Sequence, residues 1–138
     1  MTKYQAMCDY PAPLVALDHV VELSADKIVT RKYLHADEVY FRGHYPHYPI
    51  FPGVFILEAV SQAAKRYLAE YDVVGYLREL CSARLLAPLR PGEVLVCECQ
   101  CEFTSNKDQL KVAAVCRNDR GLVAKMKLVF KADGRPKC

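Results

Sequence analysis

Two ionisable side chains near the middle of the chain, His44 and Glu58, have the types and the spacing that proton-transfer chemistry requires. Three prolines follow the histidine at every third position, Pro46, Pro49 and Pro52. Each proline fixes its own φ and pushes the residue before it out of the α region. We therefore expect His44 to lie on a stiff, extended loop. A neutral imidazole there can accept a proton at physiological pH.

The segment that follows, residues 53–64, predicts an apolar helix. Pro52 suits the first helical position, since its missing N–H would be unpaired there, and Gly53 leaves the helix start free of side-chain bulk. Glu58 is the only ionisable residue of the segment, and most of the others are apolar, which is typical of an enclosed helix. A buried carboxylate is costly, so Glu58 should be neutralised, hydrogen-bonded or directed into a cavity that uses it. Gln62, one turn later, is its candidate partner.

The whole chain has 138 residues, and we expect a single domain over residues 1–138, with an irregular lead-in at 1–12 and a disordered tail at 132–138. Its formal net charge of +3 would suit an acidic partner such as a carrier protein or a nucleotide-bearing thioester, but it is too small and too scattered to indicate nucleic-acid binding. No apolar run is long enough for a membrane span, and the N-terminus lacks the pattern of a secretory signal. The sequence therefore predicts a cytoplasmic protein.

Seven cysteines are present, and three of them, Cys97, Cys99 and Cys101, alternate along a predicted strand and share its apolar face. Alternate residues of a strand lie roughly 6.6–6.8 Å apart, too far for three thiolates to close on one metal ion without a bend. Core packing therefore explains them better than zinc binding. His44 and His47 have the spacing of a helical metal pair, but the neighbouring prolines exclude that helix. We expect no metal site and reduced thiols.

The periodicity of the remaining sequence predicts an opening hairpin, the long helix and four further strands. The expected strands are residues 14–23, 27–34, 73–85, 93–104, 109–117 and 122–131, and the helix should end near residues 70–72. Turn-forming side chains between the last three strands predict a meander. One long apolar helix against five or six antiparallel strands indicates an α+β domain whose sheet wraps the helix.

The residues around the histidine and the glutamate also form a recognisable set. They comprise Gly43-His44-Tyr45-Pro46, Pro49, Pro52-Gly53-Val54, Glu58-Ala59 and Gln62. This set resembles the signature of the β-hydroxyacyl-[acyl-carrier-protein] dehydratases of the hot-dog fold, and the order of the predicted elements is similar to the family's over nearly the whole chain. A sister branch that also isomerises the product has aspartate where Glu58 stands, so the chain resembles the plain dehydratase branch.

The resemblance implies a reaction, a partner and an assembly. Water would be removed from a β-hydroxyacyl thioester carried on an acyl carrier protein, giving a trans-2-enoyl thioester in fatty-acid or polyketide-type biosynthesis, without a cofactor. In this family the histidine and the acid of one site come from different subunits, which implies a homodimer or a trimer of dimers in which His44 of one chain faces Glu58 of the other.

The chemistry of such a dehydration assigns roles to these residues. His44 would take the proton next to the carbonyl, and a Glu58 kept protonated by apolar surroundings would donate to the leaving hydroxyl. Backbone N–H groups of Gly53 or its neighbour Val54, at the helix start, would meet the negative charge on the thioester oxygen. Gln62 would orient the acid. We therefore expect Gly53, Val54 and Gln62 to contact the substrate.

Two other functions stay open. A hot-dog acyl thioesterase would use its carboxylate to activate water and hydrolyse the thioester, whereas a non-catalytic acyl-binding subunit would need neither ionisable residue. Glu58 could also serve only as a structural hydrogen-bond partner of Gln62. The pairing of a base with an acid favours dehydration, because binding alone gives no reason for both at one site.

The chain departs from the family pattern in two places. Residues 9–12 lack the His-Arg pair that often precedes the first strand, and Leu85, Leu86 and Ala87 replace basic and aromatic residues that commonly follow Arg84. These differences leave open the carrier-docking surface and the acyl chain that is accepted.

Overall fold

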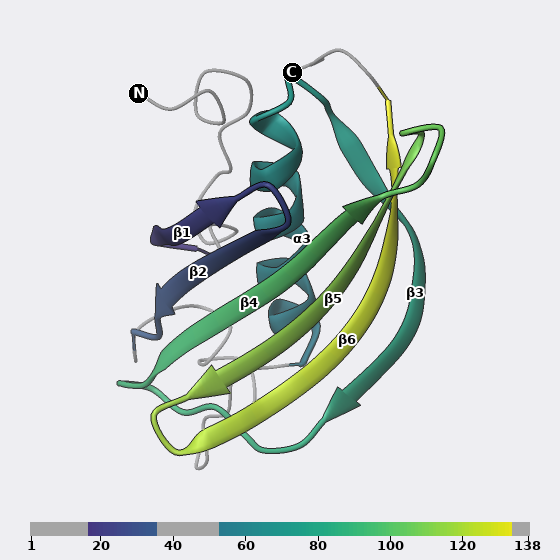
Figure 1. Cartoon of the computed structure of the whole chain (residues 1–138). Helices are drawn as coiled ribbons and strands as arrows, with labels where there is room; N and C mark the ends of the chain where they lie inside the picture. The colour runs from purple at the N-terminus through teal and green to yellow at the C-terminus, as the bar shows by residue number, and fades with distance from the viewer. Residues whose placement is uncertain (1–16, 36–52, 134–138) are drawn as a thin grey trace.

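The computed structural model of the chain describes residues 17–35 and 53–133, which form a six-stranded antiparallel sheet packed against one helix (Figure 1). The elements are β1 (His19–Ser24), β2 (Lys27–Tyr33), α3 (Gly53–Ala69), β3 (Gly75–Leu85), β4 (Val94–Phe103), β5 (Gln109–Asn118) and β6 (Gly121–Ala132). The predicted fold class, an α+β hot-dog fold with a long central helix, is confirmed. The expected irregular lead-in at 1–12 lies outside the described residues.

The strands do not follow one another in space as they do in sequence. Their order across the sheet is β1-β2-β4-β5-β6-β3, so the strand that follows the helix crosses to the far edge and pairs with β6 (Figure 1). β1 and β3 are therefore the two edge strands. The sheet curves around α3, which lies against its inner face and makes its contacts mainly with β2 and β4.

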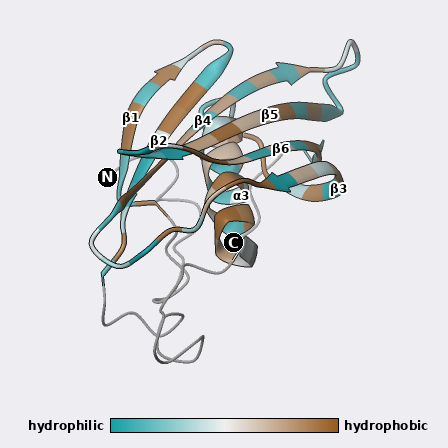
Figure 2. Ribbon diagram, turned by 90° about the horizontal axis from the view of Figure 1, so that it is seen from below, coloured by the Kyte–Doolittle hydropathy of each residue, from teal (hydrophilic) through white to brown (hydrophobic). Residues whose placement is uncertain are grey.

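The core lies between α3 and the inner face of the sheet. Residues of the four inner strands, β2, β4, β5 and β6, alternate between more buried and more exposed positions, as expected for a sheet with one covered face. Hydrophobic and hydrophilic bands follow one another along the strands (Figure 2). The inward residues of two strands are all buried, namely Leu110, Val112, Ala114 and Cys116 of β5 and Ala124, Met126, Leu128 and Phe130 of β6. Burial of each large apolar side chain stabilises the fold by about 1.5–3 kcal/mol.

Most element boundaries agree with the sequence prediction to within two residues, but the first strand begins later than expected. Its predicted start is residue 14, whereas β1 begins at His19, and Leu17 and Asp18 are described outside the strand. The backbone N–H of Asp18 still donates to the carbonyl oxygen of Arg31 at 2.7 Å, but the Tyr33 N–H finds no main-chain acceptor on the first strand. Asp18 instead accepts a hydrogen bond from the backbone N–H of Tyr33 through Oδ2 at 2.7 Å.

The C-terminal segment is ordered further than expected. Ala132, predicted to belong to a disordered tail, is the last residue of β6 and lies opposite Gly75. The backbone N–H of Asp133 donates to the carbonyl oxygen of Val74 at 2.7 Å. Main-chain hydrogen bonds therefore extend β6 to residues whose side chains gave no strand signal. Residues 134–138 lie outside the described part of the chain.

Among the described residues, no helix is long and apolar enough to span a membrane.

Candidate active site on helix α3

Glu58 lies on the first half of α3, where the helix is only partly covered. Phe55, Leu57 and Glu58 are half-buried, whereas the residues from Ala59 to Ala64 are buried without exception. Ile56, in the same turns, is buried, and Phe55 and Leu57 pack against the core, so the expected enclosure of the helix is partial in its first turns. As a result, the only carboxylate between residues 53 and 64 lies where the helix emerges from the core.

The predicted contact between Glu58 and Gln62 is present. Gln62 Nε2 donates a hydrogen bond to Glu58 Oε1 at 3.0 Å, and the amide is completely buried. A buried amide has few conformations available, so it holds the carboxyl group in one orientation. Glu58 and Gln62 are spaced four residues apart and share one face of the helix. The side chain of Val54 lies outside the described part of the structure.

The N-terminus of α3 begins at Gly53 and has no acidic residue in its first turn. A methyl group at Gly53 would lie 2.7 Å from Leu85 Cδ1, so the helix start and the end of β3 are in contact. The first N–H groups of a helix have no intrahelical partner and carry the positive end of its dipole. A bare glycine at this position lets a ligand approach those groups closely.

Leu85 is a residue of this site that the sequence reasoning did not assign. The sequence singles it out only as a departure from a family pattern, yet its side chain rests on Gly53 while remaining 60% exposed. An exposed apolar side chain at the mouth of a helix can contact the acyl part of a ligand. The available signal was weak: Leu80 and Leu85 are apolar residues at the exposed edge strand, but only the crossover of β3 brings that strand to α3.

The other predicted site residues are placed only in part. His44 lies outside the described residues, so the structure does not test its distance from Glu58. Gly53, Glu58 and Gln62 lie on the same helix, with Glu58 and Gln62 in direct contact. Their assignment as catalytic or substrate-binding residues remains a prediction.

The cysteines of the described strands belong to the core, apart from the exposed Cys81. Cys97, Cys99, Cys101 and Cys116 are buried, and the sulfur atoms of Cys97 and Cys116 lie 3.6 Å apart across β4 and β5. Burial raises the pKa of the Cys101 thiol to about 12, which favours the neutral form. Within the described residues, 17–35 and 53–133, no three His, Cys, Asp or Glu side chains converge to hold a metal ion. The prediction that the alternating cysteines pack in the core is confirmed.

Comparison with known proteins agrees with this fold. The family model of the ApeI-like proteins, described as ApeI dehydratase, matches residues 20–127. The 3-hydroxyacyl-[acyl-carrier-protein] dehydratase FabZ of Thermotoga neapolitana is 32% identical over 119 residues, which cover 86% of each chain.

Solved structures give the same fold at lower identity. The dehydratase heterocomplex ApeI:P from Xenorhabdus doucetiae has a TM-score of 0.75 at 17% identity and covers 91% of this chain and 87% of that one. A hypothetical thioesterase from Streptococcus pneumoniae with coenzyme A has a TM-score of 0.68 at 12% identity, covering 86% and 90%. At such identities the likeness shows the hot-dog fold alone.

The fold and the match to a dehydratase model over most of the chain define the class of protein as a hot-dog dehydratase. More narrowly, the chain belongs to the ApeI-like dehydratase family and is related to the FabZ-type dehydratases.

Proposed function

We propose that the protein removes water from a β-hydroxyacyl thioester carried by an acyl carrier protein, in fatty-acid or polyketide-type biosynthesis. The name of the FabZ relative, a 3-hydroxyacyl-[acyl-carrier-protein] dehydratase, supports the substrate class. The observation that carries the proposal is the position of Glu58. This carboxyl group is half-buried on an apolar helix and held by a buried amide, which is the arrangement expected of a positioned acid.

In the proposed reaction, His44 takes the proton from the carbon next to the thioester carbonyl, and the electron pair of that bond forms the new double bond. Glu58 gives a proton to the hydroxyl on the next carbon, and the C–O bond breaks as water leaves. The imidazolium and the carboxylate then exchange the remaining proton through water. Each general acid or base of this kind contributes about 10²–10⁴ to the rate.

The negative charge that develops on the thioester oxygen needs hydrogen-bond donors. We propose the N–H groups of Gly53 and Val54 for this role, because the helix start is free of acidic residues and of bulk. Gln62 positions Glu58, and Leu85 borders the same helix start from β3. The thioester oxygen would then lie at the N-terminus of α3.

We further propose that two copies complete each site, as a homodimer or a trimer of dimers. Edge strand β3 is paired on one side by β6, and its other edge has no partner strand within the described sheet. Exposed apolar side chains gather on and after this strand, namely Tyr76, Leu80, Leu85 and Leu86. An unprotected apolar edge of this kind favours pairing with a second chain. A particle of one chain, 15.6 kDa, by light scattering would contradict the proposal.

The experiment that tests the reaction is incubation with a β-hydroxyacyl thioester. Dehydration produces an enoyl thioester and its absorbance without release of thiol. A thioesterase releases free thiol instead, and an acyl-binding subunit produces neither. Thiol release without enoyl product would overturn the proposed function.

A further inference from the structure

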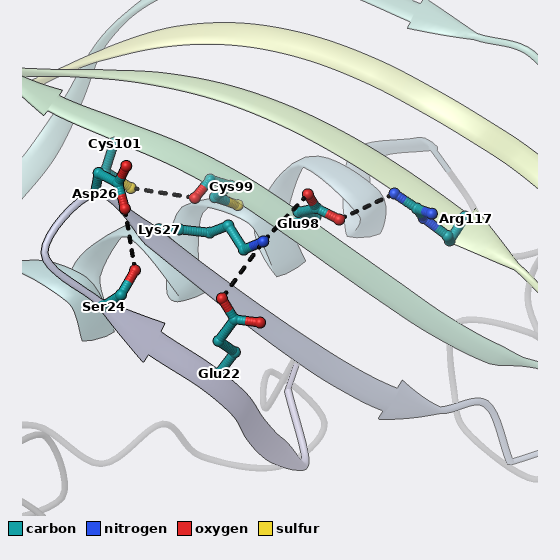
Figure 3. Close-up of polar contacts among 8 residues, drawn as sticks. All are labelled: Glu22, Ser24, Asp26, Lys27, Glu98, Cys99, Cys101 and Arg117. Atoms are coloured by element: carbon teal, nitrogen blue, oxygen red, sulfur yellow. Dashed lines mark hydrogen bonds and ion pairs between the residues drawn. The ribbon is translucent and has the colours of Figure 1, made fainter.

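The outer face of the sheet, away from α3, carries its charges in two different arrangements. Toward β1 they form a continuous chain of ion pairs across four strands (Figure 3). Lys27 Nζ lies 3.4 Å from Glu22 Oε2 and 3.7 Å from Glu98 Oε1, and Arg117 Nη2 lies 3.0 Å from Glu98 Oε2. The cations of this chain are therefore neutralised by neighbouring carboxylates.

Toward β3 the outer face carries cations that lack such partners. Arg84 of β3 lies directly opposite Lys125 of β6, and Lys127 is the next outward residue of β6. All three are exposed, and in the part of the chain that the structure describes none of them forms an ion pair. Like charges directly opposite each other on a sheet are destabilising. A bound anionic group would relieve this repulsion.

The surroundings of these three residues, which we call the basic patch, leave room for a partner. Lys127 lies between the small residues Ser82 and Ala113 in the sheet register. It also lines a hollow of about 550 Å³ on the same face, together with Lys111. The acidic residues that line this hollow are Asp26, in the β1–β2 turn, and Glu102 of β4, whereas Lys111 and Lys127 come from β5 and β6.

The basic patch lies close to the candidate active site along the strand. Arg84 immediately precedes Leu85, and successive side chains of a strand point to opposite faces. Leu85 therefore points to the inner face, where it touches Gly53 at the helix start, while Arg84 points outward beside Lys125. A partner resting on the patch can extend a flexible arm past the end of β3 to the helix start.

We propose that Arg84, Lys125 and Lys127 form the docking surface for an acidic carrier protein that delivers the acyl thioester. This inference rests on the proposed function, since it names the partner of the same site. Charge complementarity selects the occupant: three exposed cations attract an acidic protein surface. The net charge of +3 is small for nucleic-acid binding, and the patch is compact.

Single charge reversals test the docking surface, because each changes the charge by the same amount. Arg84→Glu and Lys125→Glu alter the patch, and Arg31→Glu is the matched control, since Arg31 is an exposed cation of β2 toward the opposite edge of the same face. The substrates are a β-hydroxyacyl group on an acyl carrier protein and the same acyl group on a small pantetheine-like thiol. We expect both patch variants to lower kcat/KM for the carrier-bound substrate about tenfold or more and to leave the small thioester unaffected.

A direct binding measurement tests the docking surface without relying on catalytic turnover. The measurement is fluorescence anisotropy of a labelled acyl carrier protein in its holo form, over a range of salt concentrations. Both patch variants should bind about tenfold more weakly with a shallower salt dependence, and Arg31→Glu should bind as the wild type. Unchanged binding in the patch variants, or equal weakening by Arg31→Glu, would overturn the proposal. Absence of dehydration with both substrates would overturn the proposed function, while the binding result would still decide the docking surface.

Discussion

The two ends of helix α3 meet very different surroundings. At its C-terminal end Tyr67 is buried, its hydroxyl donates to the carbonyl oxygen of Ala25 in the β1–β2 turn, and its ring packs near Phe103. At its N-terminal end, Gly53 and Glu58 are half-buried, and the described neighbour of Gly53 is the exposed side chain of Leu85. The C-terminal end, which we call the closed end, is fixed to the β1–β2 turn, and the N-terminal end, which we call the open end, keeps Gly53 and Glu58 partly exposed.

This difference separates stability from chemistry along a single helix. The closed end includes polar groups that are paired, such as Arg66, which forms an ion pair with Glu70. Burial also raises the pKa of Tyr67, so its hydroxyl stays a hydrogen-bond donor even in alkaline solution. Substitutions at the closed end should therefore change the free energy of unfolding, and substitutions at the open end should change turnover.

The largest expected effect comes from removing the acid at the open end. Glu58→Gln keeps the hydrogen bond from Gln62 but cannot donate a proton, so turnover should fall by about 10²–10⁴ with the melting temperature unchanged. His44→Ala should lower turnover by a similar factor.

Glu70→Gln is the matched control, because it makes the same chemical change at the closed end of the helix. It removes a partly exposed ion pair worth about 0.3–0.5 kcal/mol and should retain full turnover. A near-normal rate in Glu58→Gln, measured as enoyl formation, would show that Glu58 is not the acid.

The second prediction concerns whether a second chain completes the active site at the open end. Unfolded His44→Ala and Glu58→Gln chains are mixed and refolded together. If association is statistical, half of the dimers are mixed, and one of the two sites in each mixed dimer contains both native residues. About a quarter of wild-type activity should therefore return. If mixed dimers are shown by native mass spectrometry and the mixture is still inactive, the two residues do not act across subunits.

The third effect compares two glycines that lie near opposite ends of the helix. A methyl group at Gly75 would lie 2.5 Å from Leu68 Cδ1 and 2.8 Å from the carbonyl oxygen of Lys131, so neither side can easily move. At Gly53 the obstacle is the exposed end of Leu85, which can rotate away. Gly75→Val should lower the free energy of unfolding by about 1–3 kcal/mol and leave the turnover of the folded enzyme unchanged.

Gly53→Val should show the opposite pattern, since it crowds the helix start where the thioester oxygen is expected. Turnover should fall at least about tenfold, while the unfolding free energy in urea changes by less than about 1 kcal/mol. Equal losses of stability and turnover at Gly53 would indicate a packing role for this position.

Much of this comparison could be predicted from local sequence. The alternation from Leu110 to Cys116 fixes which face of a strand is inward, and the apolar run after Gly53 fixes the helix. The hydrogen bond between Glu58 and Gln62 follows from their spacing of one helical turn. These features depend on residues that are close in the chain, so a short window of sequence contains them.

The open end itself could not be predicted, because it depends on contacts between distant segments. No local pattern records that β3 crosses the sheet to pair with β6, and this crossover alone brings Leu85 to Gly53 and Arg84 beside Lys125. The partial exposure of Phe55 and Leu57 also depends on which distant segments pack against the helix. Apolar character predicted burial there, and the tertiary arrangement decided otherwise.

The smallest expected effect is a change in the alkaline stability of the closed end. Cys101 follows the residue Gln100 that pairs with Lys27 at the β1–β2 turn, and burial raises its thiol pKa from the ordinary 9.0 to about 12. The folded state therefore holds this proton more tightly than the unfolded state does. The contribution of this thiol to the free energy of unfolding is fully present below pH 9 and is lost as the pH rises toward 12.

A buried thiol with a raised pKa changes the unfolding free energy by at most about 1.4 kcal/mol per pH unit. Cys101→Ala should remove one group and flatten the decline measured by urea unfolding between about pH 9 and 11. Cys81→Ala is the comparison variant: the pKa of this thiol is also raised, by desolvation and by Glu79, but Cys81 is exposed on edge strand β3, outside the closed end, so its removal should flatten the decline less. The buried thiols Cys97 and Cys99, whose pKa values are also raised by their surroundings, should keep a residual slope in both variants. An identical slope in wild type and Cys101→Ala would mean that water reaches this thiol in the folded protein, and that the closed end is more open than its packing indicates.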